Sequence, residues 1–183
     1  MDILIDDVLI CILSNLATKD LFKFCICNQY NFEFLKKNIK YFKFNCRDNK
    51  ITDAGLEYLK GVHSISLFGC NQITDKGLEY LKGVHIIDLF KCDKITDKGL
   101  EYLKGVYAIN LNYCNQITDK GLEYLKGVHT IDFSYCYRIK DKGLEYLEGV
   151  HIINLTNCNQ ITDKGIGYIN LFIFLEYLIY FQY

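Results

Sequence analysis

Residues 73–84 read ITDKGLEYLKGV, and close copies of this stretch return every 22 residues along most of the chain. Written in rows of 22, the sequence aligns six isoleucines at the start of these copies: Ile51, Ile73, Ile95, Ile117, Ile139 and Ile161. Self-similarity at a fixed period is the signature of a solenoid, in which each repeat buries its apolar face against its neighbours. We therefore expect an α/β solenoid over most of the chain.

Each repeat carries the pattern of one short strand followed by one short helix. Alternating apolar residues at Ile65 and Leu67 predict a strand with one buried face, and such strands stack about 4.8 Å apart into a parallel sheet. Asp75 is placed to accept from the first free backbone donors of a helix that runs to Lys82, and Gly83 closes that helix as a left-handed cap. A helix of about two turns is not stable alone, so each repeat needs its neighbours. A recurrent tyrosine on the helices is expected to pack between repeats: Tyr80, Tyr102 and Tyr124.

Charge and hydropathy narrow the range of partners. Lysine plus arginine number 21 and aspartate plus glutamate 22, so there is no basic excess for a phosphate backbone, and we expect no nucleic acid partner. The apolar tail from Ile166 to Tyr183 is interrupted by Asn170, Glu176 and Gln182, so membrane insertion is not expected either. The amino terminus, MDILIDDVLICIL, has acidic residues where a secretory signal has basic ones, which predicts an intracellular protein, cytoplasmic or nuclear.

No sequence feature predicts an active site, and we expect neither enzyme activity nor a cofactor. The chain lacks the glycine-rich phosphate-binding motifs and the HExxH metal motif. Five of its nine cysteines recur at the repeat interval with no base recurring beside them, which favours packed thiols over nucleophiles: Cys70, Cys92, Cys114, Cys136 and Cys158.

The four histidines also share one column of the repeat, with Tyr107 in the middle: His63, His85, His129 and His151. Two adjacent imidazoles are too few ligands for a metal site, and the cysteine column lies seven residues further on, so no metal is expected. The crowded imidazoles are instead expected to depress one another's protonation.

The repeat matches a known family pattern. The spacing L-x-x-L-x-L-x-x-C-x-x-I of leucine-rich repeats is reproduced by Val62, Ile65, Leu67, Cys70 and Ile73. The chain thus resembles the leucine-rich-repeat family, and specifically the cysteine-containing subfamily found in substrate receptors of cullin-type ubiquitin ligases. The resemblance covers residues 41–183 and implies parallel strands on a concave face with short helices on the convex face.

The two ends of this array are less regular than its middle. The first strand is expected at Tyr41–Cys46, with a slightly longer link before Ile51. The tail departs from the repeat after Gly165, and we expect a terminal cap strand there because three of its residues continue the repeat frame: Phe172, Leu175 and Tyr177.

Residues 1–40 have helical spacing and none of the features of the repeat, so we expect a separate small all-α unit. It resembles an F-box, since ILSNL at 12–16 and KDL at 19–21 stand in the order and spacing of that family, although Ala17 stands where the family has proline and Tyr30 where it has tryptophan. The resemblance implies docking onto the adaptor of a cullin-RING ligase through Leu4, Val8, Leu9, Ile12, Leu13, Leu16 and Leu21. The alternative is a plain helical cap over the first repeat.

The outward strand positions vary between repeats while the framework is copied almost letter for letter. This mixture of aromatic and polar side chains on the concave face is the composition expected of a protein-binding patch. We expect a target protein to bind Ser66, Phe68, Asp88, Phe90, Lys91, Asn110, Asn112, Tyr113, Asp132, Ser134, Tyr135, Asn154, Thr156 and Asn157. An unused solvated face is the alternative.

These features lead to two functional hypotheses. The first is a substrate-recognition subunit of a cullin-RING (SCF-type) ubiquitin ligase, which holds a target on the repeats and reaches the cullin through the adaptor. The second is a free-standing repeat scaffold that binds proteins and has no link to ubiquitin.

Overall fold

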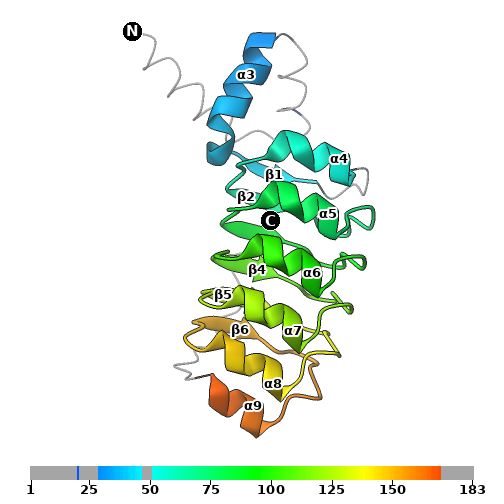
Figure 1. The fold of residues 1–183 in the computed structure, drawn as a ribbon, viewed down its shortest axis with the longest axis vertical. Helices are drawn as coiled ribbons and strands as arrows, with labels where there is room; N and C mark the ends of the chain where they lie inside the picture. The colour runs from blue at the N-terminus through cyan, green and yellow to red at the C-terminus, as the bar shows by residue number, and fades with distance from the viewer. Residues whose placement is uncertain (1–19, 21–28, 47–50, 170–183) are drawn as a thin grey trace.

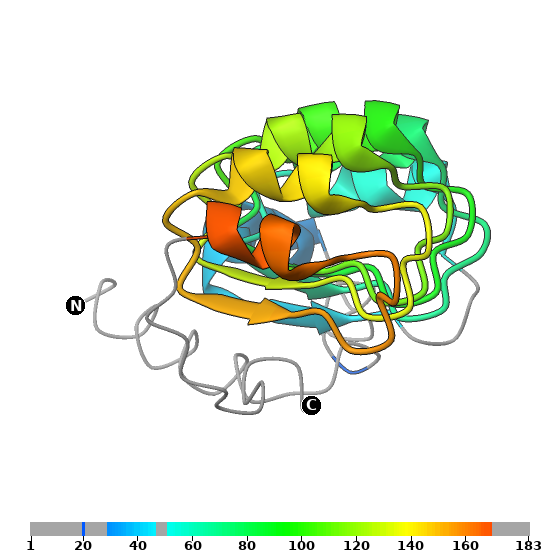
Figure 2. The ribbon, with the colours of Figure 1, turned by 90° about the horizontal axis from the view of Figure 1, so that it is seen from below.

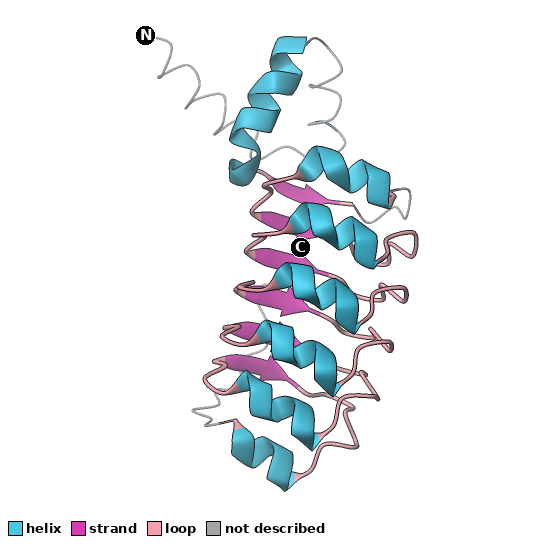
Figure 3. Cartoon of the chain, in the orientation of Figure 1, coloured by secondary structure: helices cyan, strands magenta, loops and turns pink. Residues whose placement is uncertain are grey.

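The computed structural model of the chain describes residue 20, residues 29–46 and residues 51–169. Over these residues short strands and short helices alternate, and each repeat adds one of each to a stack (Figure 1, Figure 3). The predicted α/β solenoid is confirmed. Among the described residues no helix is both long enough and apolar enough to cross a membrane.

The strands form one parallel sheet in chain order, from β1 to β6. Their bounds are β1 (Lys43–Asn45), β2 (Ser64–Ser66), β3 (Ile86–Asp88), β4 (Ala108–Asn110), β5 (Thr130–Asp132) and β6 (Ile152–Asn154). The predicted first strand, Tyr41–Cys46, contains β1. The register pairs each central residue with its repeat equivalent, so that Ile87 lies between Ile65 and Ile109. The strand frame read from the 22-residue period is therefore correct.

The helices are short and tighten toward their ends. Their bounds are α3 (Gln29–Asn38), α4 (Asp53–Leu56), α5 (Asp75–Leu78), α6 (Asp97–Leu100), α7 (Asp119–Leu122), α8 (Asp141–Leu144) and α9 (Asp163–Tyr168). A 3-10 turn follows α3 and each helix from α4 to α8: η1 (Ile39–Tyr41), η2 (Glu57–Leu59), η3 (Glu79–Leu81), η4 (Glu101–Leu103), η5 (Glu123–Leu125) and η6 (Glu145–Leu147). The helix expected to reach Lys82 thus ends at Leu81, and Gly83 follows with φ +81°, as a left-handed cap requires.

The core lies between the sheet and the helices α4–α9, which cover one face of it (Figure 2). One continuous buried cluster includes the inward strand residues, the helix leucines and the cysteine column. Helix α3 contributes Phe34 and Leu35 to the same cluster, and the turn η1 contributes Ile39. The expected division of the chain at residue 40 stays a prediction.

The cysteine column is packed, as predicted. The Cys114 thiol donates to the carbonyl oxygen of Leu89 over 3.0 Å, and the Cys136 thiol donates to that of Leu111 over the same distance. Burial raises the pKa of Cys136 to about 12. The thiols therefore stay protonated at neutral pH and serve as small apolar groups that also satisfy a backbone carbonyl of the preceding repeat.

The tyrosine column packs between repeats on the helical side, also as predicted. Tyr80, Tyr102, Tyr124 and Tyr146 are partly buried against the core. A lysine from the preceding repeat lies over each ring, and the Lys82 ammonium is 4.9 Å from the centroid of Tyr102. These cation–π contacts add to the apolar contact between neighbours.

The predicted role of Asp75 as the cap of its own helix is wrong. Thr74 is the N-cap, because it has extended backbone angles and its hydroxyl accepts from the backbone N–H of Lys76. Asp75 is the first helical residue and faces the next repeat, where its carboxylate accepts from the backbone N–H of Thr96 at 2.8 Å and from the Thr96 hydroxyl at 2.6 Å. The same link is made by Asp53, Asp97, Asp119 and Asp141, so these aspartates join two repeats instead of closing one helix.

One repeat lacks half of this link and offers a test. Lys140 stands where the other repeats have threonine, so Asp119 accepts only from its backbone N–H, at 2.6 Å. We expect Lys140→Thr to raise the free energy of unfolding by about 1 kcal/mol, because it restores both an N-cap and an inter-repeat hydrogen bond. Urea denaturation followed by circular dichroism measures the change.

The reciprocal variant is the control for this prediction. Thr118→Lys removes the hydroxyl that donates to Asp97 and should lower stability by about 0.5–2 kcal/mol. If Lys140→Thr gave no gain and Thr118→Lys no loss, the link between repeats would contribute nothing to stability.

The carboxyl-terminal end of the stack is less buried than its middle. Ile153, Leu155 and Ile161 are only partly buried, although their equivalents in the middle repeats are fully buried. The cap strand expected to continue the frame at Phe172, Leu175 and Tyr177 lies outside the described residues and stays a prediction.

Candidate functional site: a ring-bordered sheet face

The face of the sheet β1–β6 that is turned away from the helices α4–α9 is here called the outer sheet face. It is the face that was expected to be concave and to bind a target. The central residue of each strand, such as Ile109, points into the core, so the first and last residues of that strand, Ala108 and Asn110, point to the outer sheet face. Three rows of side chains run across it, one from the first strand position, one from the last, and one two residues beyond the strand.

A column of stacked rings borders the outer sheet face just before each strand. Neighbouring ring centroids are 4.6 Å apart from His63 to His85, 4.7 Å from His85 to Tyr107, 4.5 Å from Tyr107 to His129 and 4.2 Å from His129 to His151. Burial lowers the pKa of His85, with a second contribution from His63, and the pKa of His129 is lowered by burial and by His151. The sequence predicted that the imidazoles lower one another's pKa, but burial is the larger cause of both shifts. These shifts favour neutral imidazoles at pH 7 at His85 and His129, the two histidines that stack on Tyr107.

A second row of rings borders the same face just beyond the strands. Phe68 stacks on Phe90 and Tyr113 on Tyr135, each with ring centroids 4.3 Å apart, while Phe90 meets Tyr113 edge-on at 5.7 Å. The Lys91 ammonium lies 5.3 Å from the centroid of Phe90 and 5.1 Å from that of Tyr113. The row therefore combines a cation with aromatic surface, as many protein-binding patches do.

Part of this second row is held in a conformation that most residues avoid. Lys91, Tyr113, Tyr135 and Asn157 have φ between +54° and +63°, in the left-handed region, and Gly69 fills the same position in an earlier repeat with φ +68°. Glycine adopts this conformation at little cost, whereas lysine and tyrosine do so at a cost of order 1 kcal/mol. Large side chains at a strained position point to a use for those side chains beyond folding.

The last strand position serves the turn that follows it. The carboxylate of Asp88 accepts from the backbone N–H of Phe90 at 3.0 Å, and the equivalent bonds join Asn110 to Asn112 and Asp132 to Ser134 at 2.9 and 2.8 Å. Sequence reasoning missed this role. The signal was the repeated aspartate or asparagine at the end of a short strand, since both residues favour such turns.

The fourteen predicted target-binding residues differ in exposure. Those that are exposed are Phe68, Lys91, Thr156 and Asn157. Those that are half-buried are Ser66, Phe90, Asn112, Tyr113, Tyr135 and Asn154. Those that are buried are Asp88, Asn110, Asp132 and Ser134. The structure brings all of them to one face or its border, and their contact with a target stays a prediction.

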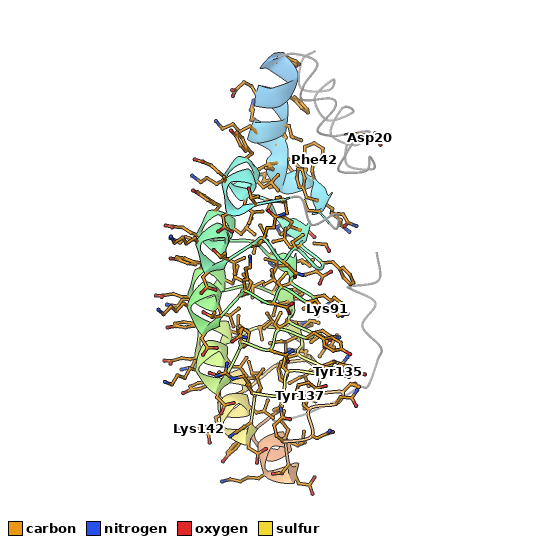
Figure 4. All side chains as sticks on the ribbon, turned by 90° about the vertical axis from the view of Figure 1, so that its right-hand side faces the viewer. Asp20, Phe42, Lys91, Tyr135, Tyr137 and Lys142 are labelled. Carbon is orange, nitrogen blue, oxygen red and sulfur yellow. The ribbon has the colours of Figure 1, made fainter. Side chains whose placement is uncertain are left out.

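Tyr137 belongs to the same border and was not singled out from the sequence. It is 53% exposed and points to the same side of the molecule as Lys91 and Tyr135 (Figure 4). The available signal was its position two residues after Tyr135, where the neighbouring repeats carry Asn115 and Asn159. An exposed aromatic ring in place of an amide extends the aromatic surface at the border.

The predicted adaptor-binding residues Leu4, Val8, Leu9, Ile12, Leu13, Leu16 and Leu21 lie outside the described residues. Within the described ranges, no group of three or more histidine, cysteine, aspartate or glutamate side chains could hold a metal ion.

Burial on the outer sheet face raises the pKa of the Asp132 carboxylate. Burial is the larger influence on this pKa and outweighs the hydrogen bonds donated by Ser134 and Asn154. A pKa raised by folding stabilises the protein below the ordinary value of 3.8, and this contribution is lost as the pH rises through the raised pKa. At pH 7 the charged Asp132 thus carries a cost.

Asp132→Asn is expected to remove this cost. Asparagine already fills the equivalent positions 110 and 154. Among the described residues, the side-chain oxygen of Asn112 is buried and accepts no hydrogen bond, so the amide of a new asparagine could donate one to it. We expect a gain of about 0.5–2 kcal/mol at pH 7. Urea denaturation at pH 7 and pH 3 should show that the gain shrinks as the medium is acidified, and a variant that is less stable at pH 7 would contradict the prediction.

Comparison with known proteins agrees with this geometry. A family model described as "Leucine Rich repeat" matches residues 62–82, 84–104, 108–126 and 150–169. The chain contains leucine-rich repeats. A search of curated proteins found no match.

A similar fold occurs among solved structures. One chain of the crystal structure of the Rad7 and Elc1 complex in yeast aligns with a TM-score of 0.56 and 18% sequence identity. The alignment covers 75% of the present chain and 43% of the yeast chain, so the present chain spans less than half the length of that neighbour. At this identity the likeness is one of fold.

Proposed function

We propose that this protein is the substrate-recognition subunit of a cullin-RING ubiquitin ligase in the cytoplasm or nucleus. Its outer sheet face binds a target protein, and its amino-terminal helices bind the ligase adaptor. Target binding is supported by one observation. Large side chains are held at positive φ on an otherwise uniform framework, at Lys91, Tyr113 and Tyr135. The framework residues are nearly the same in every repeat, whereas the border residues differ. This is expected where the residues that recognise a partner vary independently of those that maintain the fold.

The adaptor half of the proposal has two sources of support. The amino-terminal segment resembles an F-box in the order of ILSNL at 12–16 and KDL at 19–21. The structural neighbour from yeast was crystallised in a complex of two proteins, Rad7 and Elc1. A leucine-rich-repeat chain that binds a second protein is the arrangement that the proposal requires.

The function proposed is that of a bridge. By holding a target on the repeats and an adaptor on the helices, the chain raises the effective concentration of target lysines near the ubiquitin carrier and breaks no bond itself. Millimolar effective concentrations are ordinary for such tethering.

Co-purification tests the adaptor half. Tagged full-length chain incubated with a eukaryotic lysate should recover adaptor and cullin, detected by immunoblot. Leu9→Asp with Leu13→Asp should abolish this recovery, because charges replace apolar residues that the resemblance assigns to the adaptor contact. The matched control, Lys91→Glu with Tyr137→Ala, changes only the outer border and should leave recovery intact. Circular dichroism verifies that both variants keep the folded repeats.

The second candidate function is a protein-binding scaffold without a link to ubiquitin. The packing of Phe34, Leu35 and Ile39 into the same cluster as the first repeat favours it, since a capping helix is expected to pack in this way. Recovery of neither adaptor nor cullin by the unaltered chain would support the scaffold and reject the ligase.

A further inference from the structure

Five rings border the outer sheet face just beyond its strands, and they are here called the aromatic border: Phe68, Phe90, Tyr113, Tyr135 and Tyr137. Phe68 and Phe90 stack with an angle of 7° between their planes, and Tyr113 and Tyr135 stack with an angle of 8°. The Lys91 ammonium also lies over the two middle rings, Phe90 and Tyr113. These two rings therefore offer a partner mainly their edges, which are the positive part of the ring quadrupole and attract carboxylate oxygens.

Tyrosine hydroxyls add hydrogen-bond donors to the aromatic border. Burial raises the pKa of Tyr113, and the neighbouring Tyr135 raises it further, through its charge and through a side-chain hydrogen bond. The charge of Tyr137 acts in the same direction. Three phenol groups thus lie near one another over two neighbouring repeats. Their O–H groups are donors for the acceptor atoms of a partner.

The exposed charges beside the aromatic border are mainly positive. The three border loops that follow β3, β4 and β5 carry three exposed cations, Lys91, Lys94 and Arg138, and one exposed carboxylate, Asp93. Within the described residues none of these cations takes part in a salt bridge, whereas lysines on the helical side, such as Lys82, pair with a glutamate three residues earlier. Most of the positive charge at the border therefore has no carboxylate beside it in the described chain.

The cations and the rings form one surface across three repeats. Arg138 follows β5, and its guanidinium donates to the side-chain oxygen of Gln116 in the preceding repeat at 3.3 Å. Lys91 and Lys94 follow β3, so Gln116 lies in the repeat between them and Arg138. Lys91 and Tyr137 point to the same side of the molecule (Figure 4). A single bound segment can therefore reach the cations and the rings together.

The two aspartates of the outer sheet face are not presented to such a partner. Asp88 and Asp132 are each 6% exposed. Their carboxylates accept from the backbone N–H groups of Phe90 and Ser134 at 3.0 and 2.8 Å. A partner at the border therefore meets cations, ring edges and hydroxyl donors, all of which attract an anionic group.

We propose that the aromatic border binds a short acidic segment of the target protein. The carboxylates of that segment meet Lys91, Lys94 and Arg138, and its apolar side chains cover Phe68 and Tyr137, whose side chains are 38% and 53% exposed. From Phe68 to Tyr137 the border crosses three strand spacings, about 14 Å, which about four or five extended residues span. The inference rests on the proposed function, because it names the chemistry of the target segment that this side of the chain recognises.

A nucleic acid is also anionic but fits this border less well. Proteins hold single strands by stacking bases on aromatic faces in a positively charged groove. At the border the rings already stack on one another, and the exposed cations are few. The geometry thus favours an acidic peptide, and an oligonucleotide serves as a competitor in the test.

Fluorescence anisotropy of labelled peptides tests the proposal with the full-length chain. Two pools of peptides of about eight residues, long enough to cross the border, carry glutamate or lysine at alternate positions and apolar residues elsewhere. The glutamate pool should bind saturably, and several-fold more weakly in about 0.5 M salt than in about 0.1 M salt, because added ions screen exposed charges. The lysine pool should not bind.

Charge reversal locates the binding on the chain. Lys91→Glu with Arg138→Glu should weaken binding of the glutamate pool by about tenfold or more, because two attractions become repulsions. Lys98→Glu with Lys120→Glu is the matched control, since it reverses two exposed lysines on α6 and α7 and should leave the affinity unchanged. Tyr137→Ala removes an exposed ring and no charge, so it should weaken binding but keep the dependence on salt. Circular dichroism verifies that each variant keeps the folded repeats.

Four outcomes would overturn the proposal. They are no saturable binding by the glutamate pool, equal binding by the lysine pool, equal losses in the two charge-reversal pairs, and competition by a single-stranded oligonucleotide as strong as that by unlabelled glutamate peptides. The last of these would assign the border to nucleic acid. Leu9→Asp with Leu13→Asp should leave peptide binding intact, so failure to recover the adaptor and failure to bind the peptide are separate results.

Discussion

Ile109→Ala is expected to lower the free energy of unfolding by about 2–5 kcal/mol. Ile109 is the central residue of β4, is 0% exposed and pairs with Ile87 on one side and Ile131 on the other. Truncation leaves a cavity between two neighbouring repeats. Because stability in a solenoid comes from contacts between neighbours, a cavity at this position weakens the contacts on both sides.

The matched control is the same substitution at the end of the stack. Ile153 occupies the equivalent position in β6 and is only partly buried, so Ile153→Ala should cost about 1–2 kcal/mol, because less buried contact is lost. Urea denaturation followed by circular dichroism gives both values. A loss below about 1 kcal/mol for Ile109→Ala, or equal losses at the two sites, would mean that Ile109 is not in the shared core.

The framework of the fold was predictable because its determinants are local and repeated. The inward position of Ile65, the packed cysteine at 70 and the left-handed glycine at 83 each follow from a residue type at a fixed place in a 22-residue period. Repetition removes the ambiguity of a short apolar run, since the same assignment must hold in every row. The period also specified the parallel register without further information.

What the sequence did not predict depends on contacts between repeats. The carboxylate of Asp75 faces Thr96, 21 residues away, and no local rule distinguishes this from capping its own helix. The positive φ of Lys91 and Tyr113 was hidden because only Gly69 and Asn157 in that column are residue types that favour the left-handed region. Sequence alternation likewise placed Ala108 and Thr130 on the outer sheet face but could not show that both side chains are fully buried.

The sequence predicted which residues lie on the outer sheet face, but it did not predict what each of them does there. Alternation along a strand assigns Asp88 and Asp132 to the outer sheet face correctly. Their carboxylates, however, accept hydrogen bonds from the backbone N–H groups of Phe90 and Ser134 and so serve the fold first. The aromatic border residues, by contrast, have side chains that the turn does not need, and they are the better candidates for recognition.

Gly121→Ala is expected to lower the free energy of unfolding by about 1–3 kcal/mol, although alanine favours helices more than glycine does. A β-carbon at Gly121 in α7 would lie 2.6 Å from an oxygen of the Asp97 carboxylate and 3.0 Å from a methyl group of Leu100. The same oxygen of Asp97 accepts from the backbone N–H of Thr118 at 2.7 Å. The added methyl group must therefore separate two repeats or displace the carboxylate that links them.

The matched control is the glycine of α9 with free space around it. At Gly167 an added β-carbon meets no other atom within 4 Å, so Gly167→Ala should be neutral or stabilise by up to about 1 kcal/mol through helix propensity. Both substitutions add one methyl group to a helical glycine, but only Gly121 lies close to the preceding repeat. Opposite signs in urea denaturation would show that close approach of neighbouring helices, and not helix propensity, places glycine in this column. A loss of equal size at both positions would instead assign the cost of Gly121→Ala to the helix itself.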